Sequence, residues 1–314
     1  MHVIEHLDRA DRTLFSFEII PPARGKTVRD IIDMVEQIAP VKPPFIDVTS
    51  HMAEAVYEEA GDGTISRRVS KKRPGTISIC GIIQNRYGID TVPHLLCAGF
   101  TREETEDAII ELNYLGIHNV LAIRGDQSNY TKVVQQGRTR NVYARDLVTQ
   151  LVSLREARYL HDLADSEPIN FCIGVGGYPE KHVEAPSIKN DLRYLKEKVD
   201  AGADYVVTQM FFDNQAYLDF VRAARETGIT VPIIPGIKLI DNVRQLKTLP
   251  KHFHVSIPDD LVDEIMESPA QAKEIGQRWG RRQVEGLVDA GAECIHFYVM
   301  NDATPVVEMI KDLA

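Results

Sequence analysis

The stretch His118-Asn119-Val120-Leu121-Ala122-Ile123-Arg124-Gly125-Asp126 decides the fold prediction. Its four apolar residues, 120–123, form a continuous hydrophobic run, which is typical of a strand buried on both faces of a parallel sheet. Arg124, Gly125 and Asp126 follow at the carboxyl end of that strand. In parallel α/β proteins the loops at this end converge on an open crevice where chemistry takes place. A salt-bridged pair that closes one strand is the simpler interpretation of this segment alone, so the rest of the chain must decide.

The composition is that of an ordinary globular enzyme. The chain has 314 residues, of which 44% are hydrophobic and 26% charged, and its formal charge of -10 argues against general affinity for nucleic acid or an anionic membrane. The N-terminus has no basic segment followed by an apolar run, and no apolar stretch approaches the roughly 20 residues of a membrane span. We therefore expect a cytoplasmic protein. The cysteines are far apart in apolar surroundings and are predicted to be free thiols: Cys80, Cys97, Cys172 and Cys294.

Strand-like and helical patterns alternate along the whole chain. Eight short apolar segments predict strands at 14–20, 45–50, 92–97, 120–123, 169–174, 205–209, 232–237 and 294–299. Helical patterns lie at 27–39, 77–89, 101–116, 147–158, 187–202 and 214–227, from about 241, twice within 258–291, and at 304–313. This alternation, without a low-complexity linker, predicts a single (β/α)8 TIM barrel with extra helices as one domain over residues 1–314. A doubly wound sheet is the alternative, but Pro21 and Pro22 stand where its glycine-rich turn would follow the first strand.

Some local signals are specific enough to predict single features. Thr101 with Glu104 three residues later predicts a capping box, and Ser187 predicts a second helix cap. The charged segment 58–73 is interpreted as a loop with a surface helix. Residues 127–142 are polar without an apolar period, which indicates a long functional loop.

Polar side chains gather where the predicted strands end, and these ends should meet on one face. They are Glu18, Thr49, His94, Arg124 with Asp126, Tyr178, Gln209 and Tyr298. The set has few acids and no Ser-His-Asp order, which argues against hydrolase chemistry, and without H-E-x-x-H or clustered acids no metal site is predicted. The run 174–177 lacks the full dinucleotide spacing, although its glycines permit close backbone approach to a flat ligand.

Five motifs follow one another along nearly the whole chain. They are Phe17-Glu18-Ile19-Ile20-Pro21-Pro22, Leu121-Ala122-Ile123-Arg124-Gly125-Asp126, Gly177-Tyr178-Pro179-Glu180-Lys181-His182-Val183-Glu184-Ala185, the segment from Ala201 to Asp213, and His296-Phe297-Tyr298. In this order they resemble the methylenetetrahydrofolate reductases, in the short bacterial catalytic form without a second, regulatory domain.

The resemblance implies an FAD-dependent enzyme that works by a two-stage hydride relay. A reduced nicotinamide, NADH or NADPH, would reduce FAD and leave, and 5,10-methylenetetrahydrofolate would then bind in the same place, open to a 5-iminium cation and accept the hydride. Glu18 matches the general acid that protonates the folate nitrogen. Asp126 matches the acid that contacts the pterin, stabilises the cation and tunes the flavin. Gln209 matches a contact to folate and nicotinamide, and Tyr298 is placed with the substrate contacts.

The resemblance also implies a set of FAD contacts, which are Thr49, His94, Arg124, Gly125, Asp126, Tyr143, Ala144, Tyr178, His182, Ala185, Asp191 and Lys198. The residue types of Glu18 and Asp126 are compatible with these two catalytic roles. Burial of Glu18 would favour its protonated form, and a fixed anion at Asp126 would stabilise a cation. Structural interpretations stay open: Glu18 as an ion-paired barrel residue, Tyr178, His182 and Tyr298 as packed side chains, and Lys198 as an exposed lysine.

Three positions depart from the family pattern. Tyr194 stands where the family often has a polar flavin contact, Val243 where an aromatic often stacks on the substrate, and Asp302 where an arginine often binds folate. A non-catalytic or partner-dependent folate-binding subunit therefore remains an alternative to a reductase, and another barrel enzyme that shares only the scaffold is a third. The expected partners are small-molecule substrates and further copies of the chain, and the choice between NADH and NADPH stays open.

Overall fold

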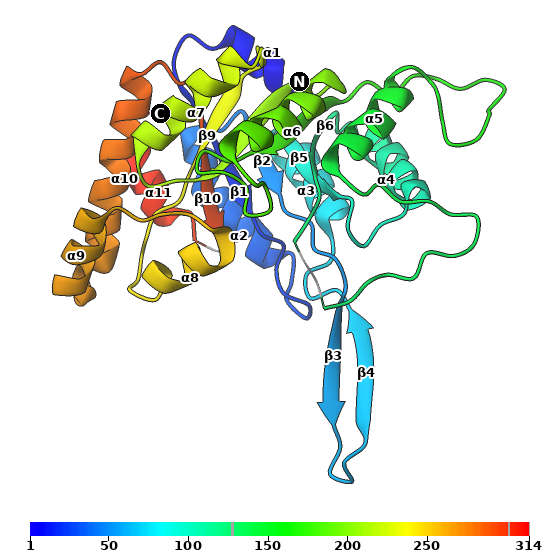
Figure 1. The fold of residues 1–314 in the computed structure, drawn as a ribbon, viewed down its shortest axis with the longest axis horizontal. Helices are drawn as coiled ribbons and strands as arrows, with labels where there is room; N and C mark the ends of the chain where they lie inside the picture. Colours follow the sequence, from blue (N-terminus) through cyan, green and yellow to red (C-terminus); the bar gives the residue numbers. More distant parts are fainter. Residues whose placement is uncertain (127–128, 301, 314) are drawn as a thin grey trace.

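Eight parallel strands close into a barrel in the computed structural model, which describes residues 1–126, 129–300 and 302–313. The order around the barrel is β1-β10-β9-β8-β7-β6-β5-β2, so each strand pairs with its neighbours in sequence and the predicted TIM barrel is confirmed (Figure 1). The barrel strands are β1 (Leu14–Ile19), β2 (Phe45–Val48), β5 (Asp90–Leu96), β6 (Asn119–Ile123), β7 (Cys172–Gly177), β8 (Tyr205–Met210), β9 (Ile233–Ile237) and β10 (Cys294–Met300).

Helices follow the strands and bury their apolar faces against the outside of the barrel. They are α1 (Val3–Arg9), α2 (Arg29–Ile38), the 3-10 turn η1 (Ala39–Val41), α3 (Thr76–Tyr87), α4 (Arg102–Tyr114), α5 (Ala144–Arg155), α6 (Ile188–Asp200), α7 (Asn214–Glu226), α8 (Gln245–Phe253), α9 (Asp259–Glu267), η2 (Pro269–Gln271), α10 (Ala272–Asp289) and α11 (Thr304–Ile310). Within the described ranges, no helix combines the length and the apolar character needed to cross a membrane.

Both predicted helix caps are present. The Thr101 hydroxyl accepts from the Glu104 backbone N–H at 3.2 Å, and the Glu104 carboxylate accepts from the Thr101 N–H at 2.9 Å. The Ser187 hydroxyl accepts from the Asn190 N–H at 3.3 Å. These bonds satisfy N–H groups that have no partner within the first turn of a helix, which fixes where α4 and α6 begin.

The amino-terminal end of the barrel is closed by α1, for which we predicted no element. Val3 and Leu7 are buried against apolar side chains of the barrel interior, such as Phe45 and Leu121. The Val3 N–H donates to the Asn119 side chain at 2.8 Å, which ties the helix to β6. Figure 1 shows α1 at the end of the barrel opposite the hairpin β3–β4. Because α1 fills that end among the described residues, we expect a ligand to enter from the carboxyl ends of the strands.

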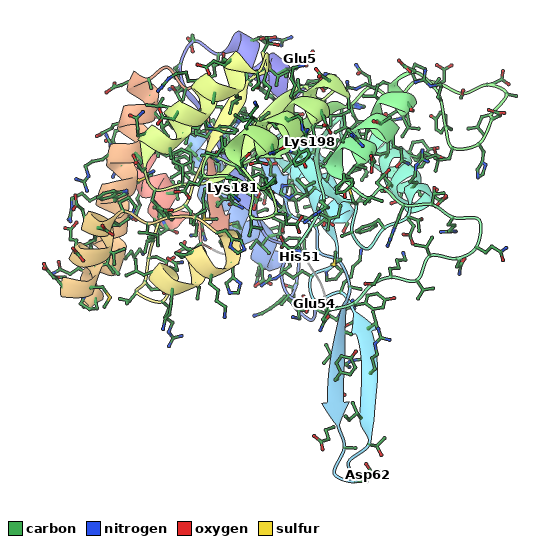
Figure 2. All side chains as sticks on the ribbon, in the orientation of Figure 1. Glu5, His51, Glu54, Asp62, Lys181 and Lys198 are labelled. Atoms are coloured by element: carbon green, nitrogen blue, oxygen red, sulfur yellow. The ribbon has the colours of Figure 1, made fainter. Side chains whose placement is uncertain are left out.

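The predicted loop and surface helix at 58–73 is wrong. The chain instead forms an antiparallel hairpin of β3 (Glu54–Glu59) and β4 (Ile65–Ser70), which projects from the barrel with Asp62 at its tip (Figure 2). The Asp62 carboxylate accepts from the Thr64 N–H at 2.9 Å, and Gly63 has φ +81°, so an Asp-Gly turn joins the strands. We read the charges as helical and overlooked this turn.

The fifth barrel strand was placed three residues too early, at 169–174, whereas β7 covers Cys172–Gly177. Two of its glycines, Gly174 and Gly177, leave space that bulky side chains occupy. A Cβ on Gly174 would overlap the ring of Tyr205, which is fully buried inside the barrel. The helix expected from about Asp241 begins at Gln245, because the Asp241 N–H donates to the Gln245 side chain at 2.8 Å and holds a turn before it.

Candidate active site

Two acids and two histidines meet inside the barrel near its open end. Register places Glu18 of β1 beside Tyr298 of β10 and beside Asp47 of β2. The Nε2 atom of His94, on β5, lies 3.4 Å from Glu18 Oε2 and 3.4 Å from Asp47 Oδ2. His296 lies 4.0 Å from each acid, with Nε2 toward Glu18 and Nδ1 toward Asp47. We call Glu18, Asp47, His94 and His296 the acid–imidazole cluster.

The cluster is buried unevenly. Asp47 and His296 are fully buried and His94 is 5% exposed, whereas the Glu18 side chain is 14% exposed. Burial alone would lower the pKa of His94, but the facing carboxylates of Glu18 and Asp47 outweigh it and raise that pKa above its usual value. Glu18 is therefore the most exposed member of the cluster, and His94 lines a neighbouring cleft.

The predicted flavin contacts after β7 form a second group, next to α6. The Tyr178 and His182 rings meet edge to face with centroids 4.6 Å apart. The Asp191 carboxylate accepts from the His182 N–H at 2.8 Å, and the Lys198 ammonium donates to the Gly176 carbonyl at 2.5 Å. Desolvation lowers the pKa of Lys198 to about 8, against a smaller opposing effect of Asp191. Burial raises the pKa of Tyr178 to about 12.

Arg124 at the end of β6 is held by an acid from the β7 loop. Its guanidinium donates to both Glu184 carboxylate oxygens, at 2.6 and 2.8 Å. Gly125 has φ +89°, a conformation that favours glycine at this turn. Ala185 is buried, and its carbonyl accepts from the Lys181 ammonium at 2.7 Å. The strand end and the β7 loop are thus fixed to one another.

Asp126 is exposed beyond the end of β6. Its charge acts on two residues of the site. Burial and the Arg73 cation lower the pKa of His51 against an opposing effect of Asp126. Burial raises the pKa of Tyr178, with a smaller contribution from Asp126. The predicted loop 127–142 contains no helix or strand from 129 onward, and residues 127 and 128 lie outside the described residues.

This loop is anchored to the base of the hairpin. The Asn129 side chain accepts from the Ala55 N–H at 3.1 Å and donates to the Ala55 carbonyl at 2.8 Å. The Arg67 guanidinium lies over the Tyr130 ring, 5.4 Å from its centroid. The hairpin therefore supports the segment that carries Asp126.

The remaining predicted residues have distinct surroundings. Tyr143 is 57% exposed at the start of α5, directly before Ala144. The Thr49 hydroxyl is buried without a hydrogen-bond partner among the described residues. The Gln209 side chain accepts from the Met210 N–H at 2.9 Å. The Tyr298 hydroxyl donates to the Thr208 carbonyl at 2.6 Å, so it is engaged within the barrel wall.

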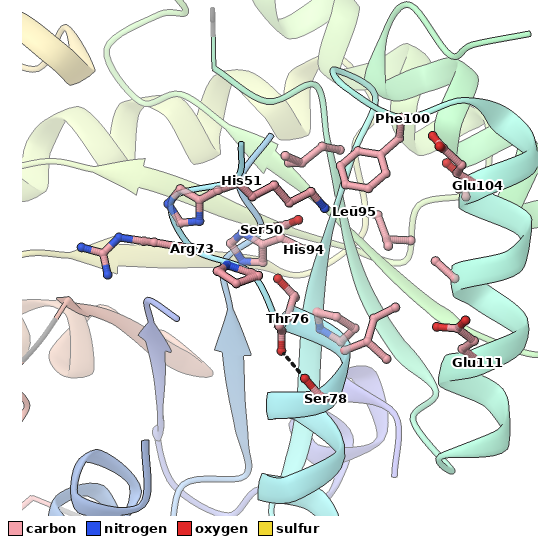
Figure 3. A pocket seen from close by; sticks show the side chains of 18 of the residues that line it. Ser50, His51, Arg73, Thr76, Ser78, His94, Leu95, Phe100, Glu104 and Glu111 are labelled. Carbon is pink, nitrogen blue, oxygen red and sulfur yellow. Dashed lines mark hydrogen bonds between the residues drawn. The ribbon is translucent and has the colours of Figure 1, made fainter. Parts of the chain in front are cut away.

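A cleft of about 630 Å³ opens beside α3 and α4. Figure 3 shows His94 and His51 on one side of it and Glu104 and Glu111 on α4 on the other. Of the predicted site residues, His94 is the one that lines this cleft, whereas the flavin contacts after β6 and β7 do not. The described residues contain no group of three or more side chains that could hold a metal ion.

Sequence reasoning did not single out Asp47 and His296, although both lie in predicted strands. A signal was available, because side chains two residues apart point to the same face of a strand, and Asp47 and His296 stand two residues before the predicted site residues Thr49 and Tyr298. Lys238 was also missed. It directly follows β9, is only 9% exposed, and its pKa is lowered by burial against the opposing charges of Asp241 and Asp302.

The three departures have structural roles of their own. Tyr194 is 44% exposed on α6, with the Arg193 guanidinium 5.1 Å from its ring centroid. Val243 packs against an apolar cluster beneath α8 and α9. The Asp302 carboxylate accepts from the Thr304 N–H at 3.0 Å and caps the start of α11.

Comparison with known proteins identifies the family. A family model described as methylenetetrahydrofolate reductase matches residues 3–314. The chain belongs to the methylenetetrahydrofolate reductase family. It is 32% identical over 291 residues to the 5,10-methylenetetrahydrofolate reductase of Pectobacterium carotovorum subsp. carotovorum, covering 92% of this chain and 86% of that one. It is also 32% identical over 315 residues to a probable methylenetetrahydrofolate reductase (NADPH) of Caenorhabditis elegans, covering 99% of this chain and 43% of that one.

The chain spans about half the length of several relatives that it matches, as in C. elegans, rice and maize. Among solved structures, a protein from Clostridium thermocellum that binds two copies of 5-methyl-5,6,7,8-tetrahydrofolic acid superposes with a TM-score of 0.61. That match covers 99% of this chain and 98% of the other at 12% sequence identity, so it shows a shared fold.

Lys198 supplies a pH-dependent prediction for flavin binding. Its pKa of about 8 means that the ammonium loses its proton in mildly alkaline solution. If Lys198 binds an FAD phosphate, binding favours the charged form, and FAD affinity should fall as pH rises above about 8, by up to about tenfold per pH unit. Lys198→Met should lower affinity about 10- to 100-fold at pH 7 and remove this decline.

Equilibrium dialysis of FAD between pH 7 and 10 measures this dependence. Lys189→Met, at an exposed lysine of the same helix, is the matched control and should bind FAD as the unaltered protein does. His182→Ala should also weaken binding while the apo fold stays stable. Unchanged affinity in both Lys198→Met and His182→Ala would place FAD elsewhere on the barrel.

Proposed function

We propose that this protein reduces 5,10-methylenetetrahydrofolate to 5-methyltetrahydrofolate with a reduced nicotinamide, through FAD bound at the carboxyl end of the barrel, and that residues 1–314 are one catalytic domain. The observation that carries the proposal is the placement of Glu18. This carboxyl lies on β1 inside a barrel of the reductase family, partly exposed and with His94 Nε2 3.4 Å away. A general acid needs such a place, because it must touch the substrate while burial disfavours its ionised form.

The residues around β6 and β7 fit an FAD molecule. Lys198, Arg124 and His182 lie at or after the ends of these strands and supply cationic or polar groups for a pyrophosphate. Gly176 has open space at its Cβ position apart from one contact at 4.0 Å, so backbone can approach a flat ring. The buried Thr49 hydroxyl is available for a ligand atom. When bound, FAD would accept a hydride from the nicotinamide and donate it to the folate.

The chain's own residues would divide the work of folate reduction. Glu18 would donate its proton to the folate nitrogen as the methylene bridge opens. Asp126 would face the cation that forms, as a fixed negative charge placed before the reaction begins. Gln209 would orient both substrates in turn at one place, which suits a relay in which the nicotinamide leaves before the folate binds.

A second function, folate binding without catalysis, is favoured by a specific observation. Asp302 caps α11 and Val243 is packed into an apolar cluster, so neither presents the arginine or aromatic contact that the family often has. Both positions stand where the family often contacts the tail of the folate. The acid–imidazole cluster still places Glu18 where a general acid is needed, and for this reason we prefer the reductase.

Absorption spectroscopy under anaerobic conditions separates the two functions. The purified protein should show a flavin spectrum with about one FAD per chain, and NADH or NADPH should bleach it. A flavin that neither nucleotide bleaches would favour the binding protein. A protein that binds no flavin would exclude the reductase proposal and leave only the shared barrel.

A further inference from the structure

Asp47 is the most isolated acid of the acid–imidazole cluster. It is fully buried, so no substrate can touch it. Neither of its carboxylate oxygens has a hydrogen-bond partner among the described residues. Its nearest cationic partner is His94 Nε2 at 3.4 Å, followed by His296 Nδ1 at 4.0 Å. A buried carboxylate without hydrogen bonds is costly unless a cation compensates its charge, so Asp47 requires a protonated imidazole beside it.

The same nitrogen of His94 also serves Glu18. Its Nε2 lies 3.4 Å from both acids, and one N–H can be donated along only one of these directions at a time. His296 does not relieve the competition, because it lies 4.0 Å from each acid and its Nδ1 is hydrogen-bonded to the Ser16 hydroxyl at 2.9 Å. Two carboxylates therefore face one well-placed imidazolium.

We propose that Asp47 is a positioning residue that competes with Glu18 for the His94 imidazolium and thereby keeps the Glu18 carboxyl protonated at the mouth of the barrel. If both acids were ionised, the buried cluster would carry more negative charge than His94 can compensate, and like charges at neighbouring strand positions disfavour that state. Either carboxylate, when ionised, favours the charged form of His94. Asp47 has no access to water, so its charge is the one that holds the imidazolium, and Glu18 retains the proton. The use of this proton for folate rests on the proposed function, whereas the sharing of His94 rests on the distances alone.

Other titratable and charged groups face the cluster from every neighbouring element. They are Cys80 on α3, Tyr205 on β8, Cys294 and Tyr298 on β10, His51 after β2, and Arg73 and Asp126, whose charges act on His51. Burial raises the pKa of Cys294 to about 12 and that of Tyr298 well above its usual value, so both stay neutral near pH 7. Among the described residues, His94 therefore lies nearer to both acids than His296 does, at 3.4 Å against 4.0 Å, and the experiment varies the charge of Asp47.

Replacing Asp47 with asparagine removes one negative charge and keeps the shape. Glu18 then faces the imidazolium alone and should ionise at lower pH. The folate half-reaction needs the protonated acid, so its rate falls at high pH, and we call this fall the alkaline limb of its pH–rate profile. In Asp47→Asn the alkaline limb should move to lower pH by about one unit or more. The rate at pH values well below the limb should stay within a few-fold of that of the unaltered protein. The pH profile of flavin reduction by NADH should not move. A loss of rate that is equal at every pH would indicate structural damage and overturn the proposal.

Matched variants separate charge from packing. Asp47→Ser removes the same charge with a smaller side chain, and its alkaline limb should move in the same direction as that of Asp47→Asn. Cys294→Ala changes a buried neighbour of Ser16 in the barrel interior without changing charge, and should leave the limb in place. A limb that moves equally in Cys294→Ala would contradict a role for the Asp47 charge.

Nuclear magnetic resonance tests the cluster without reference to any reaction. In the unaltered protein, ¹⁵N resonances should show the His94 ring protonated at pH 7; a neutral ring would overturn the proposal even if every Asp47 variant failed to fold. The ¹³C carboxyl signal of Glu18, identified by its loss in Glu18→Gln, should titrate at lower pH in Asp47→Asn. If this shift occurs in a protein that does not reduce folate, the proposed function fails and the shared imidazolium stands. If folate is reduced and the Glu18 signal does not shift, the proposed function stands and the shared imidazolium is wrong.

Discussion

Replacement of Glu18 by glutamine is expected to slow reoxidation of the reduced flavin by methylenetetrahydrofolate by about 10²–10⁴-fold, the usual contribution of a general acid. Opening the methylene bridge needs a proton on the departing nitrogen. Glutamine keeps the size of the side chain and a hydrogen-bond donor but cannot deliver that proton. Hydride transfer from the nicotinamide needs orientation and no protein acid, so flavin reduction by NADH should change only a few-fold.

Stopped-flow traces at the flavin absorbance measure both steps in one sample. Glu54→Gln is the matched control, because it alters an acid at the base of the hairpin that pairs with Lys72 at the surface. Both of its rates should equal those of the unaltered protein. If Glu18→Gln slowed both steps equally, or neither, Glu18 would be a structural ion-pairing residue of the barrel.

Replacement of Asp126 by asparagine is expected to raise the flavin midpoint potential by about 30 mV, which corresponds to ~1.4 kcal/mol for a two-electron couple. A fixed carboxylate opposes the negative charge of the reduced flavin, and its removal makes reduction easier. The same change should slow the folate half-reaction by about tenfold or more, because the developing cation loses its counter-charge. The NADH half-reaction should slow less.

Spectroscopic titration against a reference dye gives the potential. Asp302→Asn is the control at the same end of the barrel, because Asp302 is engaged in capping α11 and should leave the potential unchanged. A potential that does not rise in Asp126→Asn would place this carboxylate away from the flavin. Because Asp126 is exposed, the shift should shrink as salt is added.

The barrel could be predicted because its signals are local. Buried parallel strands read as apolar runs, and the Thr101 and Ser187 caps mark where helices begin. The hairpin β3–β4 was missed because its strands are mostly exposed and carry adjacent charged side chains rather than a buried apolar face. The predicted strand ended before Gly176 and Gly177, because glycine carries no strand signal in a sequence. A Cβ on Gly177 would lie 2.8 Å from Val206 Cγ1, and this tertiary contact is not visible in the spacing of residues.

The candidate site was predictable where a residue stands at a strand end. Glu18 and His94 come together as expected, and Arg124 lies at the end of β6. The pairing of Arg124 with Glu184 and the burial of Asp47 depend on contacts between distant segments, which the spacing of residues along the chain does not contain. Which residues of β1, β2 and β10 stand beside one another is known only from the barrel register.

One double-mixing experiment tests the central claim most directly. The protein is reduced with one equivalent of NADH without oxygen, mixed with 5,10-methylenetetrahydrofolate, and quenched for product analysis as the flavin absorbance returns. The account predicts one 5-methyltetrahydrofolate formed per flavin reoxidised, at the same rate. A reduced flavin that stays bleached in the presence of methylenetetrahydrofolate, or that is reoxidised without forming 5-methyltetrahydrofolate, would contradict it.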